Sequence, residues 1–483
     1  MERAASACTE YILEMHGPDE KFIVVCGKGN NGGDGLAIAR MLVHAACPVE
    51  VFILEYIESS SPDFISNLEL LKKIPSLQIY HIRHSDEFKI KEKVIIIDAI
   101  LGTGINKPTA GLIAEVISLI NNSKNKVIAI DVPSGLPVDE PMPKKWPVIS
   151  ATVTLTFQQP KLAFLFPEGG EYVGQLKVLN IGLDADHIAS MQSAFYFLQD
   201  SDISSLLISR GRFAHKGTFG HSLLFSGSLG KMGAALLSSH ACVRSGTGLL
   251  TAHIPRCGYE IMQTSLPEAM VSLDSTEEHI SSLPALDKYT SIGIGPGMGT
   301  HADTAKVLKL LIQTTPCPLV LDADALNIIS ENKTWLAFLP ARTILTPHPK
   351  EFDRLTEKHT DSWARLKSAQ VLAHKHSIII VLKGAYTAIV MPDRSVWFNS
   401  TGGPALAKGG SGDVLTGIIT ALLSRGYAPR EATFLGVYLH GLAADLALAD
   451  IHPESMLASD VIAHISSAFE YLYEDKNSFS ANN

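Results

Sequence analysis

A glycine-rich stretch near the carboxyl end, Asn399 to Gly417 (NSTGGPALAKGGSGDVLTG), contains the residue types that phosphoryl chemistry requires. Gly409, Gly410 and Gly412 leave backbone N–H groups uncovered, and an apolar run with helical spacing follows. N–H groups at such a helix start attract anions such as phosphate. Asp413 would then be placed to accept a proton from a hydroxyl while a phosphoryl group is transferred to that hydroxyl. A glycine-rich turn with an acidic residue at a helix start is also common, so the motif does not decide between the two interpretations.

Strand ends in the same half of the chain supply further polar groups. The apolar run SIIIVLKG ends at Lys383, which can reach a phosphate as a point charge, and Thr387 follows closely. TILTPHP ends at His348 between two prolines, where a histidine is more often an ordinary surface group. CPLVLDADALN ends at Asp322 and Asp324, which fit helix capping as well as ligand contact. Strands at this spacing with intervening helices predict a large, mostly parallel sheet covered on both faces.

The amino-terminal half contains three strand ends rich in oxygen atoms. The motifs are GKGNNGGDG, KVIIIDAILGTG and KVIAIDVPSG, and each follows an apolar run. Such strands belong to a parallel sheet, and ligands gather at the carboxyl ends of its strands. A single aspartate there is more often a helix cap, but three such ends together indicate a site for a hydroxylated ligand or a hard cation. The side chains concerned are Asn30, Asn31, Asp34, Asp98, Asp131 and Ser134.

The first of these loops also matches the dinucleotide-binding pattern GxGxxG at Gly27, Gly29 and Gly32. Glu55, at the end of the next strand, would be the ribose-binding acid of a dehydrogenase. Asp34, however, would place a negative charge at the helix start where the pyrophosphate should bind. The position of Asp34 therefore argues against a dehydrogenase.

Composition bounds the remaining possibilities. At about 150 residues per domain, 483 residues with 46% hydrophobic content predict two or three domains with sizeable cores. The net charge of −9 argues against a nucleic-acid partner. The 6 cysteines form no CxxC pair, which fits a cytoplasmic protein, and no apolar run approaches the ~18 residues of a membrane span. The strand–helix rhythm breaks near residue 200, which predicts domains over 1–200 and 201–483.

The motifs GKGNNGGDG, DAILGTG and DVPSG, in this order, resemble the epimerase domain of the NAD(P)H-hydrate repair enzymes over residues 1–190. The resemblance implies a Rossmann-like α/β/α domain that interconverts the R and S forms of hydrated NADH and NADPH (NADHX and NADPHX). Inversion at C6 of the reduced ring requires an acid–base group at the hydroxyl of that carbon, and we expect Asp131 to be this group. The resemblance also implies a potassium ion held by Asn31, Asp98 and Ser134.

The same resemblance implies a set of hydrate contacts in this first domain. They are Asn30, Asn31, Gly32, Gly33, Asp34, Gly102, Thr103, Gly104, Ile105, Asn106, Lys107, Pro108 and Asp131. The later segment TFQQPKLAFLFPEG, with Lys161, also resembles that family. The family's domain begins before its MERA-like motif, at which this chain starts, so we expect the amino-terminal helix to be incomplete.

HKGTFG, GSLGKMGAALL, GPGMG, DADALN, TPHPKE, KGAYT and the opening stretch resemble the second domain of the same enzymes over residues 205–475. The resemblance implies a ribokinase-like fold and dehydration of the S-hydrate driven by ADP or ATP with Mg²⁺. It implies hydrate contacts from Ala234, Gly297, His348 and Asp413, and nucleotide contacts from Lys383, Gly384, Ala385, Tyr386, Thr387 and Gly412. Gly403 and Leu406 depart from the family pattern TGNPGMA, and we expect changed loop packing with activity retained.

In the implied reaction, Asp413 accepts the proton of the C6 hydroxyl as this attacks the terminal phosphoryl group. The N–H groups of Gly410 and Gly412, with Mg²⁺, carry the developing charge, and phosphate is then expelled by the ring nitrogen. No residue decides between ADP and ATP, although the fused arrangement favours ADP. We expect a homo-oligomer with these small molecules as partners. The alternative is a ribokinase-like small-molecule kinase with a non-catalytic amino-terminal binding domain.

Overall fold

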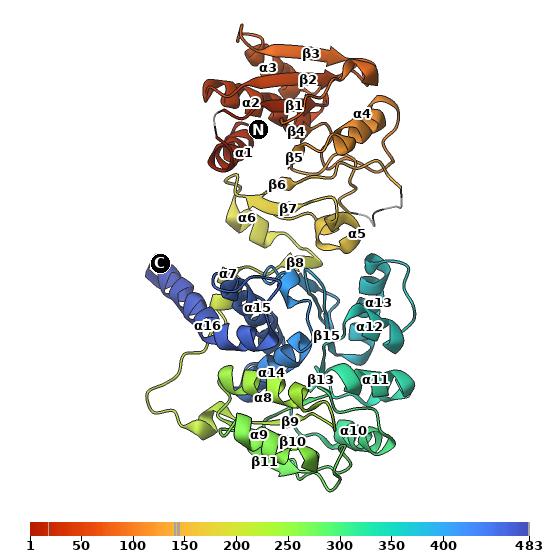
Figure 1. The fold of residues 1–483 in the computed structure, drawn as a ribbon, viewed down its shortest axis with the longest axis vertical. Helices are drawn as coiled ribbons and strands as arrows, with labels where there is room; N and C mark the ends of the chain where they lie inside the picture. Colours follow the sequence, from red (N-terminus) through yellow and green to blue (C-terminus); the bar gives the residue numbers. More distant parts are fainter. Residues whose placement is uncertain (18, 140–141, 143–144, 482–483) are drawn as a thin grey trace. The chain divides into compact units, whose positions relative to one another are not determined.

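The computed structural model describes residues 1–17, 19–139, 142 and 145–481. The chain forms two compact units, Met1–Gln192 and Ser193–Asn483, and each is an α/β structure built around one sheet (Figure 1). The second unit begins before the predicted boundary near residue 200 because Phe195–Phe197 form an edge strand of its sheet.

The sheet of the first unit is parallel throughout its described residues, in the order β3-β2-β1-β4-β5-β6-β7. Every residue of the central strands β1 and β4 is buried, as expected for a parallel sheet covered on both faces. The strands are β1 (Phe22–Cys26), β2 (Val49–Leu54), β3 (Gln78–Ile82), β4 (Ile95–Ala99), β5 (Lys126–Ile130), β6 (Val153–Phe157) and β7 (Gln175–Leu179).

Helices cover both faces of this sheet. Separate apolar clusters lie under α1, α2 and α3 on one face and under α4 on the other (Figure 1). The helices are α1 (Glu2–Met15), α2 (Asn30–His44), α3 (Pro62–Leu71), α4 (Gly111–Asn122), α5 (Pro167–Gly170) and α6 (Ala185–Ser190).

The sheet of the second unit has the order β11-β10-β9-β12-β13-β14-β15-β16-β17-β8. It is parallel from β11 to β15, β16 runs antiparallel to both neighbours, and β17 pairs in parallel with β8, so the predicted mostly parallel sheet is confirmed. The strands are β8 (Phe195–Phe197), β9 (His221–Phe225), β10 (Leu249–Ile254), β11 (Met270–Leu273), β12 (Ser291–Ile294), β13 (Leu319–Leu321), β14 (Ile344–Leu345), β15 (Ile379–Leu382), β16 (Ala388–Val390) and β17 (Val396–Phe398).

Helices α8, α14, α15 and α16 lie on one side of this sheet and α10 to α13 on the other (Figure 1). The helices are α7 (Asp200–Ser204), α8 (Met232–Arg244), α9 (Tyr259–Ser265), α10 (Ala302–Thr314), α11 (Ala323–Glu331), α12 (Pro349–Leu355), α13 (Ser362–His376), α14 (Ser411–Ser424), α15 (Pro429–Ala447) and α16 (Ala458–Ala481). Short 3₁₀ turns lie at Ser85–Glu87, Leu162–Leu165, Lys216–Phe219, Arg256–Gly258, Lys333–Phe338 and Pro404–Leu406. None of the helices in the described residues is long and apolar enough to cross a membrane.

Helix α14 forms the centre of the second unit. Every residue from Val414 to Ser424 is buried. Helix α8 packs closely against it because Gly417 has no side chain: a Cβ there would lie 2.1 Å from the carbonyl oxygen of Ser238. This contact and the sheet below hold the start of α14 in one place.

Candidate active sites

The start of α14 is shaped by glycines. Gly410, the residue before the helix, has φ 94°, a left-handed conformation that favours glycine, and a Cβ there would lie 2.5 Å from Leu237. Gly412 lies beneath two charged groups: a Cβ added to it would be 3.3 Å from Lys383 Nζ and 3.5 Å from Asp322 Oδ2. The helix start thus presents N–H groups, a cation and carboxylates at one point.

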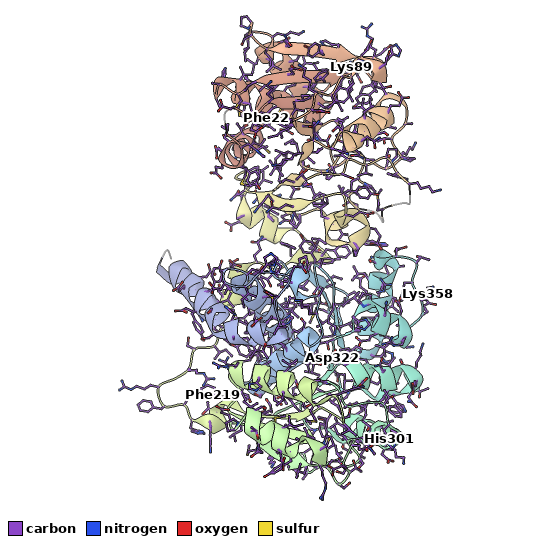
Figure 2. The ribbon with its side chains drawn as sticks, viewed as in Figure 1. Phe22, Lys89, Phe219, His301, Asp322 and Lys358 are labelled. Atoms are coloured by element: carbon purple, nitrogen blue, oxygen red, sulfur yellow. The ribbon has the colours of Figure 1, made fainter. Side chains whose placement is uncertain are left out.

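Asp322 and Lys383 form an ion pair at this point. The distance from Lys383 Nζ to Asp322 Oδ1 is 3.0 Å, and the almost fully buried Asp322 also accepts a 2.9 Å hydrogen bond from Thr416 of α14. Asp322 precedes α11, yet within the described structure its side chain makes no capping bond to that helix. Of the two interpretations open from the sequence, the structure therefore favours a position in the site. Figure 2 labels Asp322 within the second unit.

Asp413 stands in the first turn of α14. Its pKa is raised to about 7, mainly by burial and also by the negative charges of Asp322 and Asp324, while Lys383 acts in the opposite direction. Within the described structure Asp413 forms no ion pair, because the nearby lysine is bound to Asp322. A carboxyl group with a pKa near 7 is well matched to general-base catalysis at neutral pH.

The predicted nucleotide contacts form a turn directly after β15. The Thr387 hydroxyl donates to the Gly384 carbonyl at 3.2 Å, and the N–H of Lys383 donates to the carbonyl of Pro347 at 3.0 Å. Gly384 and Ala385 are exposed, and Tyr386 is half-buried, with its ring 6.2 Å from that of Phe197. The turn thus offers an open surface next to the lysine. That these residues contact a nucleotide, however, stays a prediction.

His348 is held by a reciprocal cap at the start of α12. Its Nδ1 accepts the N–H groups of Lys350 and Glu351 at 3.1 and 3.2 Å, and the Glu351 carboxylate accepts the His348 N–H at 2.8 Å. Burial lowers the pKa of His348, so a neutral ring with its proton on Nε2 is favoured. The buried Glu351, which the sequence analysis missed, also lies 3.9 Å from Lys383 Nζ.

Ala234 and Gly297, two predicted hydrate contacts, touch each other. Gly297 has φ 59°, and a Cβ there would lie 2.8 Å from that of Ala234. The Ser228 hydroxyl donates to the Gly297 carbonyl at 2.7 Å, and the N–H of Gly299 donates to Asp324 at 2.8 Å. The loop after β12 and the start of α8 therefore form one wall, tied to the Asp322–Asp324 turn.

His440 of α15 is a second residue that the sequence analysis missed. Its Nε2 lies 3.2 Å from the hydroxyl of Ser411, the first residue of α14. Burial lowers its pKa to about 4, so the ring is neutral at physiological pH. The sequence around it, GVYLHGLAAD, gives only a helical apolar pattern and no sign of this contact.

In the first unit, several predicted contacts line a cleft of about 320 Å³. It is lined by Gly29, Asn30, Asn31, Asp34, Tyr56, Ile100, Leu101, Gly102, Thr103, Gly104, Asp131 and Phe157. Within the described structure the other predicted contacts, Gly32, Gly33 and residues 105–108, do not line this cleft. Gly32 instead allows the tight turn, since a Cβ there would lie 1.9 Å from the carbonyl oxygen of Gly27.

Asp131 lies in this cleft and is paired with a lysine. Lys161 Nζ is 2.8 Å from Asp131 Oδ1, which also accepts the Thr156 hydroxyl and the Phe157 N–H, each at 3.2 Å. Asp131 has φ 64°, a left-handed conformation that is uncommon for aspartate and typical of functional positions. Burial raises the pKa of Asp34, a second carboxyl group in the cleft, to about 7.

The three residues of the predicted potassium site also lie together. Asp98 is fully buried and accepts the Ser134 hydroxyl at 2.6 Å, and Asn31 donates to the Leu101 carbonyl at 2.9 Å. Asn31 Oδ1 is buried without a hydrogen-bond partner among the described residues, and burial raises the pKa of Asp98 to about 6. Asn31 and Ser134 both bond the backbone of Leu101, so an unpartnered carbonyl oxygen and a buried carboxylate belong to one cluster, which fits a monovalent cation.

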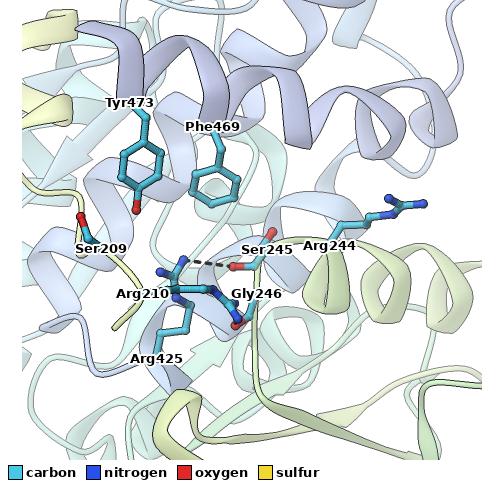
Figure 3. Close-up of a pocket in the computed structure, with 8 residues that line it drawn as sticks. All are labelled: Ser209, Arg210, Arg244, Ser245, Gly246, Arg425, Phe469 and Tyr473. Carbon is cyan, nitrogen blue, oxygen red and sulfur yellow. Dashed lines mark hydrogen bonds between the residues drawn. The ribbon is translucent and has the colours of Figure 1, made fainter. Parts of the chain in front are cut away.

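The second unit has a cavity of about 430 Å³, which is larger than the cleft of the first unit and lies away from the predicted contacts. Figure 3 shows its lining, in which the guanidinium of Arg425 donates to the Ser245 carbonyl at 3.5 Å while Phe469 and Tyr473 project from α16. Among the described residues, its lining includes none of the predicted contacts, so volume alone does not identify the site.

Comparison with known proteins covers both units. Residues 1–163 match the family model described as YjeF-related protein N-terminus, and residues 222–467 match NAD(P)H-hydrate dehydratase. The bifunctional NAD(P)H-hydrate repair enzyme Nnr of Moorella thermoacetica is 35% identical over 95% of this chain and 89% of its own. A Bacillus subtilis ADP/ATP-dependent NAD(P)H-hydrate dehydratase, co-crystallised with ATP and Mg²⁺, is 32% identical with a TM-score of 0.50, covering 57% of this chain and 98% of its own. A ribokinase-like protein of Enterococcus faecalis is 27% identical with a TM-score of 0.50, covering 59% of this chain and 98% of its own.

Proposed function

Since the chain belongs to the bifunctional NAD(P)H-hydrate repair enzymes, we propose that each unit carries one of two repair reactions. The first unit interconverts the R and S forms of hydrated NADH or NADPH. The second dehydrates the S form with ADP or ATP. The observation that carries the second assignment is the position of Asp413, which lies on an anion-binding helix start beside the Lys383–Asp322 pair.

In the second unit the hydrate lies between the Ala234–Gly297 wall and His348. The nucleotide occupies the turn after β15, and its terminal phosphate lies over the start of α14. This arrangement is supported by Lys383, which is close to Gly412 and can contact a phosphate without leaving Asp322. The terminal phosphorus and the C6 hydroxyl then meet next to Asp413.

Asp413 accepts the hydroxyl proton, for which its pKa near 7 is suited. The N–H groups at the start of α14 and the Lys383 ammonium stabilise charge on the phosphoryl oxygens during transfer. The phosphorylated hydroxyl leaves as phosphate because the ring nitrogen supplies electrons, and loss of the C5 proton restores the reduced ring. The activated hydroxyl is thus a leaving group, and no phosphoester accumulates.

The carboxylates around Asp413 also fit a divalent cation. Asp322 is paired with Lys383 at 3.0 Å and Asp324 with Lys231 at 3.4 Å, and the negative charges of both aspartates raise the pKa of Asp413. Carboxylate and phosphate oxygens are the ligands that Mg²⁺ takes, so Asp322 and Asp324 would hold it together with the nucleotide. When bound, Mg²⁺ neutralises charge on the phosphates.

In the first unit Asp131 gives a proton to the C6 hydroxyl, so that water leaves as the ring nitrogen supplies its electron pair, and takes a proton back when water adds to the other face of C6. Lys161, at 2.8 Å, fixes the orientation of the carboxylate and balances its charge. Asn31, Asp98 and Ser134 hold a potassium ion, which would add positive charge beside the cleft; support comes from the unpartnered Asn31 Oδ1.

One experiment tests both assignments. The purified chain receives mixed R and S hydrates with ADP or ATP and Mg²⁺, and the absorbance of the reduced nicotinamide is followed. We expect full recovery by the intact chain, recovery of the S fraction alone by Asp131→Asn, and none by Asp413→Asn. Recovery by Asp413→Asn at the rate of the intact chain would reject the proposed base.

The same reaction mixture tests the kinase alternative. A kinase releases a stable phosphoester, whereas the repair reaction releases inorganic phosphate in a one-to-one ratio with the reduced cofactor. Similarity to repair enzymes along 95% of the chain argues against the kinase.

We also propose that the protein works in the cytoplasm as a homo-oligomer. All six cysteines are free, and four of them are buried, which fits a reducing compartment. Light scattering coupled to size-exclusion chromatography measures the mass of the assembly. A mass of 52.1 kDa, that of a single chain, would reject the homo-oligomer.

A further inference from the structure

Two histidines and an aspartate meet on the second unit outside the proposed active site. His279 lies in the loop between β11 and β12, His301 precedes α10, and Asp303 lies in the first turn of α10. One ligand atom from each residue lies within 4.8 Å of the other two. Figure 2 places His301 at the edge of the unit, well away from Asp322.

The distances in this cluster match metal ligation better than hydrogen bonding. Asp303 Oδ2 is 3.7 Å from His279 Nε2 and 3.6 Å from His301 Nδ1, beyond an ordinary hydrogen bond. Two ligands held about 2.0–2.1 Å from a tetrahedral ion lie roughly 3.4 Å apart. These two nitrogen–oxygen distances therefore differ by only a few tenths of an ångström from the distance between two ligands of a tetrahedral zinc ion.

Further contacts leave the ligand atoms of His279 and Asp303 available. His279 Nε2 is buried and has no hydrogen-bond partner among the described residues. Lys306 binds Asp303 Oδ1 at 2.8 Å and leaves Oδ2 to the histidines. The imidazole centroids are 3.8 Å apart, and both rings lie beside the same Asp303 carboxylate oxygen. His301 Nδ1 accepts the Asp303 N–H at 3.2 Å, and a metal–nitrogen bond would replace this bond.

The loop that carries His279 is held in place from below. The buried Asp274, paired with buried His253 at 3.1 Å, accepts the N–H groups of Ser281 and Ser282 at 2.8 and 2.9 Å. The loop therefore loses little further freedom when a ligand binds, which favours a site over a chance surface contact.

We propose that His279, His301 and Asp303 form a binding site for a divalent transition metal, with Zn²⁺ as its best occupant. Two imidazoles and one carboxylate suit zinc and its neighbours, whereas Mg²⁺ and Ca²⁺ prefer oxygen ligands. Three protein ligands leave a fourth position for water.

The site would connect two segments behind the substrate wall. The carbonyl of Glu278 accepts the N–H of Leu229 at 2.9 Å, in the turn that leads to α8 and Ala234. His301 lies two residues after Gly299, in the loop that contains Gly297. A bound ion therefore cross-links the loop after β12 to the loop before it, and its role is to stabilise the wall.

The experiment uses the full chain stripped of metal, without nucleotide. Zn²⁺ binding is measured by calorimetry and by metal analysis after gel filtration, and Co²⁺ serves as a spectroscopic probe of imidazole ligation. His279→Gln removes one ligand, and His301→Ser removes another but keeps a residue that caps α10. His452→Ser is the matched control, because His452 Nδ1 also accepts the N–H of the residue two positions later, at 3.3 Å.

We expect one Zn²⁺ per chain for the intact protein and for His452→Ser, with a melting temperature that rises with Zn²⁺. Both ligand variants should bind at least tenfold more weakly and lose this rise while melting normally without metal. Two results would overturn the proposal. If the intact chain binds no Zn²⁺, the cluster is only an ion pair with a helix cap; if both ligand variants bind like the intact chain, the ion lies elsewhere.

Discussion

The two units place their proposed acid–base aspartates at different points of the fold and give them different electrostatic partners. Asp131 directly follows the strand β5, whereas Asp413 lies in the first turn of the buried helix α14. In the first unit Asp131 is paired directly with Lys161 at 2.8 Å. In the second, the lysine is paired with Asp322 instead, and burial raises the pKa of the unpaired Asp413 to about 7.

This difference follows the chemistry that we propose for each unit. An epimerase must give a proton and take it back at one position, and a neighbouring cation keeps the carboxylate in place through both steps. A phosphoryl transfer needs a base for one proton and separate positive groups for the phosphate. The lysine of the second unit remains available to the phosphate because Asp322, and not the base, is its partner.

Removing the base of the second unit should have the largest effect. We expect Asp413→Asn to slow S-hydrate dehydration about 1000-fold, since the amide cannot accept the proton and general bases contribute roughly 10²–10⁴-fold. Nucleotide affinity and R/S interconversion should persist. The rate comes from absorbance of the reduced cofactor with pure S-hydrate, and interconversion from chromatographic separation of the epimers. Equal loss of both activities would mean that the units are not separate in function.

The mirror experiment removes the carboxylate of the first unit. Asp131→Asn should slow R/S interconversion about 100-fold and leave dehydration of pure S-hydrate unchanged. Lys161→Met is the companion variant and should slow interconversion less, because the lysine orients the carboxylate at 2.8 Å and does not exchange the proton. If the lysine variant is the slower of the two, the roles of these residues are reversed.

Replacing Lys383 tests whether this lysine causes the difference between Asp131 and Asp413. Lys383→Met should raise the KM for the nucleotide and lower kcat, together about 100-fold, because a phosphate partner is lost. Lys383 also lowers the pKa of Asp413, so the acidic limb of the kcat/KM profile should move to higher pH. Lys333→Met is the control, since Lys333 contacts the Thr356 carbonyl away from the site. An unchanged pH profile would place Lys383 too far from the base.

The potassium site gives a smaller effect. Asn31→Ala should reduce interconversion about tenfold and remove its preference for K⁺ over Na⁺, because the unpartnered Oδ1 is lost. Asn121→Ala is a suitable control, as this residue bonds only the backbone around Val148 and Ser150 among its described contacts. A wild-type rate independent of K⁺ would remove the basis for an ion at this position.

The effect of Asp413→Asn on stability should be the smallest of these effects. Stability should increase, whereas activity is lost. Asp413 has a folded pKa near 7, above its ordinary value of 3.8, so its contribution to stability is full below about pH 4 and is lost as the pH rises through 7. Asp413→Asn should therefore melt a few degrees higher than the intact chain at pH 8, and the difference should shrink towards pH 4. Thermal unfolding at these two pH values measures it. A lower melting temperature at pH 8 would contradict a buried, uncompensated charge.

Local patterns were sufficient to predict much of this molecule. Apolar runs that end in Asp98, Asp131, Asp322 or Lys383 predicted buried parallel strands, and parallel strands bring their ends to one edge of a sheet. Glycines before an apolar helical pattern predicted the start of α14. These features depend on neighbours in the sequence and on backbone geometry, so no distant contact is needed to recognise them.

Pairing between distant residues was decided only by the tertiary structure. Nothing near Lys383 shows that its partner is Asp322, and nothing near Asp131 shows that Lys161 approaches it. Glu351 and His440 were missed because an acidic residue after a proline and a histidine in an apolar helix have many ordinary roles. The three-residue strand β8 was too short to separate from the linker. The sequence determines the type of each side chain. The protonation state of Asp413, however, depends on burial and on the charges that packing brings near, so only the tertiary structure identifies it as a suitable base.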